Sequence, residues 1–302
     1  MDIESLLRRM EDQAVTVSRA SSATMARLAA EAVRSGRRAA VAVKSRDALS
    51  VMRGLTTLFT PELSVGCPSS APSGQRSAQA ATEVPLWEKP WVFLPPFTPR
   101  SLSREGWAER MAVLYALRTG SAQGVVFTAD SLIPLLPPLD FLDSRTLTLR
   151  RGEDFSPELL TEQLVEWGYQ RVPMVAHAGD MARRGDIFDV LPPGYERPLR
   201  LEFFGDTIDE MRVFDFSTQR SVGQLDEVTF LPVIPLGFGD AWARGIQKHW
   251  KALEQRKVIA SLSRTSLEHA LEKADMRLLP GAVWPGASAL DDWLAPETFC
   301  FL

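Results

Sequence analysis

The sequence predicts an α/β domain that is interrupted by a smaller α+β domain. Strand-like and helical segments alternate over residues 1–142, which is typical of a parallel sheet with covering helices. Short strands separated by Gly and Pro turns then dominate residues 143–232. Helical patterns return over residues 233–302. We therefore expect the first and last segments to form one domain and the middle segment to be inserted in it.

The composition is that of an ordinary folded protein, and the net charge leaves only a local basic patch open as a nucleic-acid contact. The chain has 302 residues, 45% of them hydrophobic, and a net charge of −4, so no basic signature covers the whole sequence. Cys67 and Cys300 lie far apart and form neither a disulfide framework nor a zinc spacing. No signal peptide or long apolar span occurs. We expect a cytoplasmic protein without a membrane partner.

The first segment contains the elements of a parallel sheet. Its strand candidates are Ala14–Val17, Ala39–Val43, Trp91–Leu94 and Gly124–Thr128, and its helix candidates begin after the loop Ser18–Ser22 and at Arg104. Met25, Leu28, Ala29 and Ala32 share one stripe of the first helix, which Gly36 ends. The stretch Gly66–Ala81 is rich in Ser, Ala, Pro and Gly and is expected to be a loop.

A nucleotide-binding domain would place its phosphate loop between the strand Ala14–Val17 and the following helix. Such a loop needs glycines for close backbone approach, a lysine for the phosphates and a hydroxyl for magnesium. Ser18–Thr24 contains neither glycine nor lysine, and no GxxxxGK[ST] run occurs in the chain. We expect no ATP, and no other cofactor, to bind here.

The middle segment begins with a strand through Leu147 and Leu149. Ser156, Pro157 and Glu158 are typical of a helix start, and Gly168 ends this helix. An edge strand over Tyr169–Val175 is expected to follow.

The stretch Ala182–Arg220 then predicts a small antiparallel sheet. A strand over Ile187–Leu191 precedes a Pro-Pro-Gly turn, and Leu199–Phe204 alternates apolar and charged residues. Gly205-Asp206 fits a tight hairpin into a third strand, Ile208–Phe214. One face of this sheet should be packed and the other exposed.

The exposed face places Phe204 beside Arg200 and Glu202. An exposed Phe next to Arg is typical of a protein-interaction hot spot. Alternatively, Phe204 packs beneath a neighbouring loop and Arg200 is a solvated strand residue. The residues alone leave both interpretations open.

The last segment predicts two helices and a final strand. Asp240 is a candidate cap for the first helix, and Thr265 with Glu268 has the spacing of a capping box for the second. The apolar end Phe299–Leu302 indicates that a longer protein continues beyond it.

No catalytic or metal site is predicted. The three histidines form no metal-spaced pair. Asp186 and Asp189, three apart on a predicted strand, should point to opposite faces.

The runs RRGDIFDVLPP (183–193) and RPLRLEFFGDTIDEMRVFDFSTQRS (197–221) resemble the UvrB and transcription-repair coupling factor families of bacterial excision repair. The resemblance implies a RecA-like domain over residues 1–142 and 233–302, with a UvrB domain 2-like insertion over residues 143–232. It is closer to the coupling factors, which have also lost the phosphate loop. In both families the inserted domain docks onto UvrA, and the residues implicated correspond to Arg184, Arg200 and Phe204. Arg183 is an additional basic neighbour.

The implied function is recruitment of UvrA to stalled transcription complexes by a module that is not itself an enzyme. Contacts with RNA polymerase and DNA would belong to other domains of a longer protein, which would be an ATP-dependent translocase. Two alternatives remain: a nucleotide-dependent repair enzyme like UvrB, and an autoinhibitory module that docks onto the motor domains of the same protein.

Overall fold

The computed structural model describes residues 21–44, 47–59, 85–97, 103–132, 135–237, 239–257, 261–272 and 280–301. The predicted strand Ala14–Val17 and the predicted loop Gly66–Ala81 lie outside these ranges. Residues 18–20 of the phosphate-loop position Ser18–Thr24 lie outside them as well.

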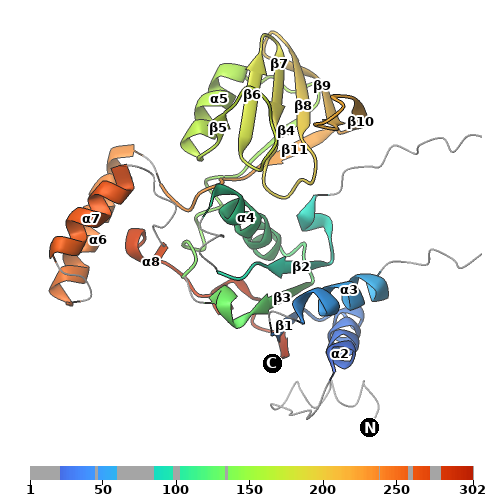
Figure 1. The fold of residues 1–302 in the computed structure, drawn as a ribbon, viewed down its shortest axis with the longest axis vertical. Coiled ribbons are helices and arrows are strands. Elements are labelled where there is room, and N and C mark those ends of the chain that lie inside the picture. Colours follow the sequence, from blue (N-terminus) through green and yellow to red (C-terminus); the bar gives the residue numbers. More distant parts are fainter. Residues whose placement is uncertain are drawn as a thin grey trace, which may run out of the picture.

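A four-stranded parallel sheet forms the base of the structure (Figure 1). Its strands are β1 (Ala39–Val43), β2 (Trp91–Leu94), β3 (Gly124–Thr128) and β12 (Phe299–Phe301), in the order β12-β1-β3-β2. Three of the four strands predicted from the first segment, Ala39–Val43, Trp91–Leu94 and Gly124–Thr128, are confirmed. The predicted final strand is confirmed as well, since β12 pairs in parallel with β1. The chain thus returns to its first sheet after the middle segment.

Helices cover both faces of the parallel sheet (Figure 1). They are α2 (Ser22–Arg34) and α3 (Ala48–Phe59) on one face and α4 (Arg104–Thr119) on the other. Alternation along β1 explains the two layers: Val41 packs with α2 and α3, whereas Ala40 packs with α4. Ser21 caps α2 by accepting a hydrogen bond from the Thr24 amide.

The middle segment forms a second, mixed sheet of six strands (Figure 1). Its strands are β5 (Gln170–Arg171), β6 (Asp180–Arg184), β7 (Ile187–Val190), β8 (Leu199–Phe204), β9 (Thr207–Phe214) and β10 (Ser221–Gln224), in the order β10-β9-β8-β7-β6-β5. The predicted strands within it are confirmed in β7, β8 and β9. The expected strand Tyr169–Val175 is wrong in extent, because pairing with β6 stops before Pro173, which has no amide hydrogen to donate.

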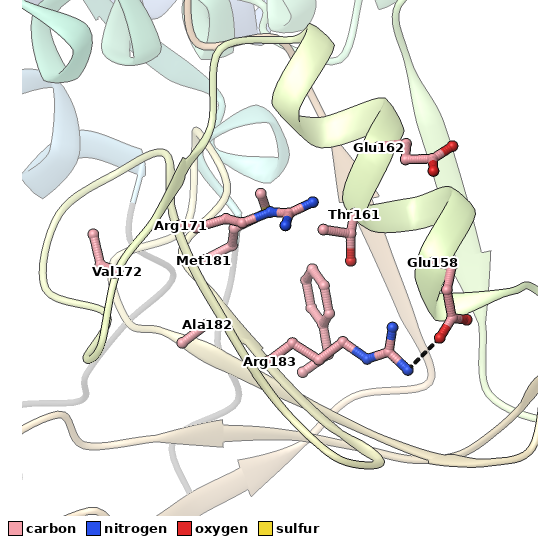
Figure 2. A pocket seen from close by; sticks show the side chains of 9 residues that line it. Glu158, Thr161, Glu162, Arg171, Val172, Met181, Ala182 and Arg183 are labelled. Atoms are coloured by element: carbon pink, nitrogen blue, oxygen red, sulfur yellow. Dashed lines mark ion pairs between the residues drawn. The ribbon is translucent and has the colours of Figure 1, made fainter.

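Three further elements complete the middle segment. A two-stranded ribbon joins β4 (Leu147–Arg150) to β11 (Glu227–Phe230), and α5 (Pro157–Glu166) covers one face of the six-stranded sheet (Figure 2). The helix has the predicted start, with Ser156 accepting from the Leu159 amide, and it buries Leu160 and Leu164.

Aromatic side chains connect the middle segment to the segment that precedes it. The Trp87 ring packs edge-on against Tyr115 of α4 and Tyr195, with centroids 5.1 and 5.4 Å away. The Gly194 carbonyl accepts a hydrogen bond from the Leu86 amide at 2.8 Å. Gly194 has φ +89°, and a Cβ there would lie 2.3 Å from the Trp87 ring. The Pro-Pro-Gly turn of the middle segment therefore packs against Trp87 of the first segment.

The last segment contains α6 (Gly239–Gln255), α7 (Ser261–Glu272) and α8 (Pro280–Val283). Asp240 and Thr265 lie inside α6 and α7, so both predicted caps are wrong. Trp250 is fully buried and its Nε1 donates to the Ala282 carbonyl at 2.6 Å. In the described ranges, no helix has the length and apolarity needed to cross a bilayer.

Candidate protein-interaction surface

The six-stranded sheet has one face toward α5 and one face away from it. The strand register puts Arg184, Ile187, Glu202 and Glu210 in one row across four strands. The next row contains Ala182, Asp189, Arg200 and Arg212. We call these two rows, together with Phe204, the outer face. All three predicted interaction residues lie on it.

Phe204 is the most exposed large apolar side chain among the described residues, with 83% of its surface accessible. Its neighbour Phe203 is buried, as strand alternation requires. Gly205 follows with φ +62° at the first position of the two-residue turn. The sequence alternative in which a loop covers Phe204 is therefore wrong.

A bulge in β9 preserves the two faces at this end of the hairpin. Glu202 pairs with Glu210, but Phe203 pairs with Ile208, so Asp209 is an extra residue in β9. Ile208 can then face the core while Asp209 faces solvent. The bulge thus keeps the apolar residues of β9 buried beneath the outer face.

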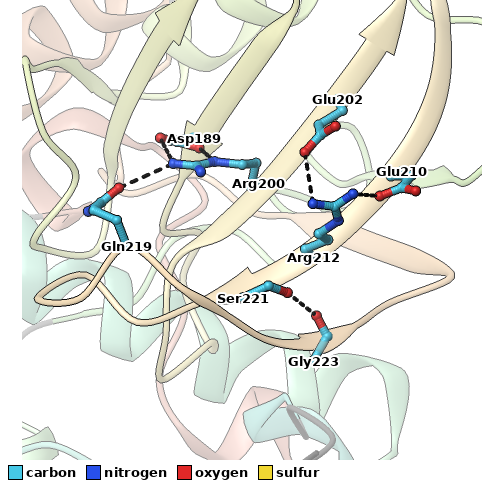
Figure 3. Close-up of polar contacts among 8 residues, drawn as sticks. All are labelled: Asp189, Arg200, Glu202, Glu210, Arg212, Gln219, Ser221 and Gly223. Carbon is cyan, nitrogen blue, oxygen red and sulfur yellow. Dashed lines mark hydrogen bonds and ion pairs between the residues drawn. The ribbon is translucent and has the colours of Figure 1, made fainter.

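The Arg200 side chain is largely buried among its neighbours on the outer face and is not solvated (Figure 3). Its Nε and Nη2 donate to the two carboxylate oxygens of Asp189 at 2.6 and 2.8 Å. Nη2 also donates to Oε1 of Gln219 at 3.2 Å, and the guanidinium lies 4.6 Å from the Phe214 ring centroid. Hydrogen bonding to Asp189 raises the pKa of Arg200. Only 22% of the side chain is exposed, which contradicts the solvated alternative.

Arg212 forms a second ionic group on the same face (Figure 3). Its guanidinium pairs with Glu202 at 3.3 Å and with Glu210. The charged side chains of β7, β8 and β9 on the outer face are thus largely paired with one another. Phe204 and Ile187 are exposed apolar side chains on the same face.

Arg183 and Arg184 point to opposite faces of β6. Arg183 pairs with Glu158 of α5 at 2.7 Å and borders a cavity of about 390 Å³ between helix and sheet (Figure 2). Arg184 is exposed on the outer face and donates to the Pro173 carbonyl. Among the described residues, no carboxylate lies within ion-pair distance of Arg184. Arg184 is thus the outer-face cation that an acidic partner could neutralise.

The two aspartates considered for catalysis occupy different environments. Asp186 lies in the turn between β6 and β7, not on a strand as predicted, and its carbonyl accepts from the Phe203 amide. Asp189 is buried on β7, and its carboxylate accepts a hydrogen bond from Arg200. Within the described ranges, no group of three metal-ligating side chains comes together.

A second cavity lies at the carboxyl ends of the parallel strands, where α/β sheets commonly bind ligands. Its volume is about 450 Å³. Its described lining is Ala48, Leu49, Met52, Phe93, Pro96 and Thr128, and this set contains no cation. These lining side chains are not those of a phosphate site.

The fold is mixed α/β, and its middle segment exposes an aromatic side chain of the kind that is common at protein interfaces. Residues 147–234 match the family described as "UvrB interaction domain". The chain is 32% identical over 192 residues to a transcription-repair-coupling factor of Myxococcus xanthus, covering 62% of this chain and 16% of that protein. It is 34% identical over 125 residues to that of Escherichia coli K12, covering 41% and 11%. It is 36% identical over 150 residues to that of Mycobacterium tuberculosis, covering 49% and 12%.

The predicted resemblance to the transcription-repair coupling factors is confirmed by these matches. The chain spans less than a fifth of the length of each of these relatives. The three predicted interaction residues, Arg184, Arg200 and Phe204, all lie within the matched domain.

Proposed function

We propose that this chain is the UvrA-recruiting module of a transcription-repair coupling factor, and that the outer face is its docking surface. The observation that carries the proposal is Phe204, 83% exposed at the end of β8 inside the segment that matches the UvrB interaction domain. An aromatic side chain held in solvent by a rigid hairpin loses its hydrophobic stabilisation until a partner covers it.

Arg184, Arg200 and Phe204 have distinct roles in this proposal. Phe204 enters an apolar pocket of UvrA, and Arg184 pairs with a carboxylate at the edge of that pocket. Arg200 is anchored by Asp189, and its Nη1 meets no acceptor among the described residues, so one nitrogen is left for the partner. Loss of one desolvated Arg–carboxylate pair should weaken binding by ~2–5 kcal/mol.

We also propose the domain division: residues 1–142 and 233–302 form a degenerate RecA-like domain, and residues 143–232 are inserted in it. The parallel pairing of β12 with β1 supports the return to one domain. In the full coupling factor, contacts with stalled RNA polymerase and DNA would lie in the parts beyond this chain.

The RecA-like domain is proposed to bind no ATP and to catalyse no reaction. The missing GxxxxGK[ST] run and the apolar cavity at the carboxyl ends of the strands support this. Isothermal titration with ATP and Mg²⁺ should give no heat of binding. Saturable binding at micromolar ATP would instead favour a UvrB-like nucleotide-dependent enzyme.

Biolayer interferometry of the immobilised chain against UvrA tests the proposed function. Phe204→Ala should weaken binding at least tenfold, since it removes a central aromatic anchor. Leu159→Ala is the matched control, because Leu159 is 59% exposed on α5, away from the outer face. Absence of binding by the folded wild-type chain would contradict the proposal and favour docking onto the motor domains of the same protein. Equal binding by both variants would show that the docking surface lies elsewhere.

A further inference from the structure

The loop between β9 and β10 is an ordered structure beside the outer face. The Asp215 carboxylate accepts hydrogen bonds from the amides and hydroxyls of Ser217 and Thr218, at 2.6–3.1 Å. The Asp215 amide donates to the Arg220 carbonyl at 3.0 Å, and the Gln219 amide donates to the Asp215 carbonyl at 2.7 Å. Residues 215–220 thus form a closed loop, which we call the Phe216 loop.

Phe216 is exposed at the start of this loop. Its accessible fraction is 53%, whereas Phe214, two residues earlier, is 2% exposed beneath Arg200. An apolar side chain on a pre-ordered loop loses little conformational entropy when a partner covers it. Phe216 therefore has the properties of an interface anchor.

Arg200 connects the Phe216 loop to the centre of the sheet (Figure 3). Its Nη2 donates to Gln219 Oε1, and Gln219 Nε2 donates in turn to the Phe216 carbonyl at 2.9 Å. Gln219 has φ +57°, a conformation that costs a non-glycine residue energy and needs such contacts to persist. The hydrogen bonds that join Asp189, Arg200 and Gln219 thus fix the backbone of Phe216 relative to β8.

Phe204 and the Phe216 loop lie at opposite ends of β8. Arg200, which contacts the loop, precedes Phe204 by four residues, which corresponds to about 13 Å along a strand. The ionic groups of Arg200 and Arg212 occupy the space between the two ends. Exposed aromatic side chains thus lie near both ends of β8, and paired charges of the outer face lie between them.

We propose that Phe216 is a second apolar anchor for the same partner and that Arg200 is the residue that positions it. The inference rests on the proposed function, because it assumes that the outer face docks onto UvrA. The partner surface would carry two apolar pockets separated by a polar strip. Arg200 would then act largely through Gln219 and the Phe216 loop.

The test is a double-mutant cycle in the same binding assay. Phe216→Ala should weaken binding at least tenfold, and Arg200→Ala should do the same. If Arg200 acts through the loop, its loss should cost at least about threefold less affinity when Phe216 is already alanine. The matched cycle of Arg184→Ala with Phe216→Ala should be additive, since Arg184 lies on β6 and donates to the Pro173 carbonyl rather than to any described residue of the loop.

Hydrogen exchange of the free chain supplies a readout that does not depend on binding. Arg200→Ala should raise amide exchange at Ser217, Thr218 and Gln219 about tenfold, while exchange in β9 stays unchanged. Unchanged exchange in the loop would overturn the positioning role.

The outcomes separate this inference from the proposed function. If Phe204→Ala weakens binding and Phe216→Ala does not, the second anchor is wrong and the docking face stands. If the wild-type chain binds UvrA and neither variant changes that binding, both the second anchor and the docking face are wrong. Additive losses from Arg200→Ala and Phe216→Ala would show that Arg200 contacts the partner independently.

Discussion

Asp189 and Arg200 face each other directly across β7 and β8, and both carboxylate oxygens accept from the guanidinium, at 2.6 and 2.8 Å. This bidentate geometry ties together the two central strands of the six-stranded sheet. Since Arg200 also reaches Gln219, the pair connects the strand that presents Phe204 to the loop that presents Phe216. The polar centre of the outer face is therefore a structural link between β8 and the Phe216 loop.

Asp189→Asn should lower the free energy of unfolding by about 2 kcal/mol, because it leaves a partly buried guanidinium without its counter-charge. The change keeps the size of the side chain, so packing is little altered. Urea unfolding followed by tryptophan fluorescence gives the measurement. Asp209→Asn, in the exposed bulge of β9, is the control and should leave the midpoint unchanged. Equal midpoints for both variants would mean that the pair adds nothing to stability.

Gly194→Ala should destabilise the chain more than Gly152→Ala. Both glycines have positive φ, +89° and +82°, so both substitutions incur backbone strain of about 1–2 kcal/mol. Only at Gly194 would the new Cβ lie 2.3 Å from the Trp87 ring, whereas Gly152 has no atom within 4 Å. The difference between the two thermal midpoints measures the packing of this turn against Trp87. Similar midpoints would argue against the close packing of Trp87 on this turn.

Arg183→Ala and Arg184→Ala should differ in UvrA binding although the residues are adjacent. Arg184 lies on the outer face, so its loss should weaken binding by at least ~1.4 kcal/mol, or tenfold. Arg183 faces α5 and pairs with Glu158, and its loss should change affinity less than twofold. Interferometry of the two variants side by side gives both values. A larger effect at Arg183 would move the docking surface to the α5 side.

The pKa of Asp215 should be about 2 in the folded chain, because hydrogen bonds from Ser217 and Thr218 stabilise its ionised carboxylate. Since the unfolded value is about 3.9, the stability that this group contributes is fully present above pH ~4. It is lost as the pH falls from about 4 through the folded pKa. Carbon-detected NMR of the Asp215 carboxyl group measures this directly. A titration midpoint near 3.9 would show that the Phe216 loop is not held by Asp215.

Much of the parallel sheet could be predicted because its strands are short apolar runs. The bounds of β1, β2 and β3 follow from Ala39–Val43, Trp91–Leu94 and Gly124–Thr128 alone. The helix caps of the last segment could not be predicted. Asp240 and Thr265 are residue types that often cap helices, but both lie inside helices that begin earlier. A capping residue stabilises a helix less than the burial of its apolar face does, and in α6 that face includes the buried Trp250.

The outer face could be predicted in part. Alternation along Leu199–Phe204 places Arg200, Glu202 and Phe204 together, and the structure agrees. The pairing of Arg200 with Asp189 depends on the register of β7 against β8, which the sequence does not specify. Gln219 reaches Arg200 from a loop 19 residues away through a positive-φ conformation, and no local pattern indicates that contact. The contact between Arg200 and the Phe216 loop therefore could not be predicted from the sequence.

Site-specific photo-crosslinking tests the central claim most directly. Benzoylphenylalanine would replace Phe204 in one variant and Leu159 in another, and each would be irradiated with UvrA. Both positions are exposed, and they lie on the outer face and on α5 respectively. We expect a covalent complex with UvrA from position 204 and none from position 159. Crosslinking from position 159 alone would contradict the assignment of the outer face as the docking surface.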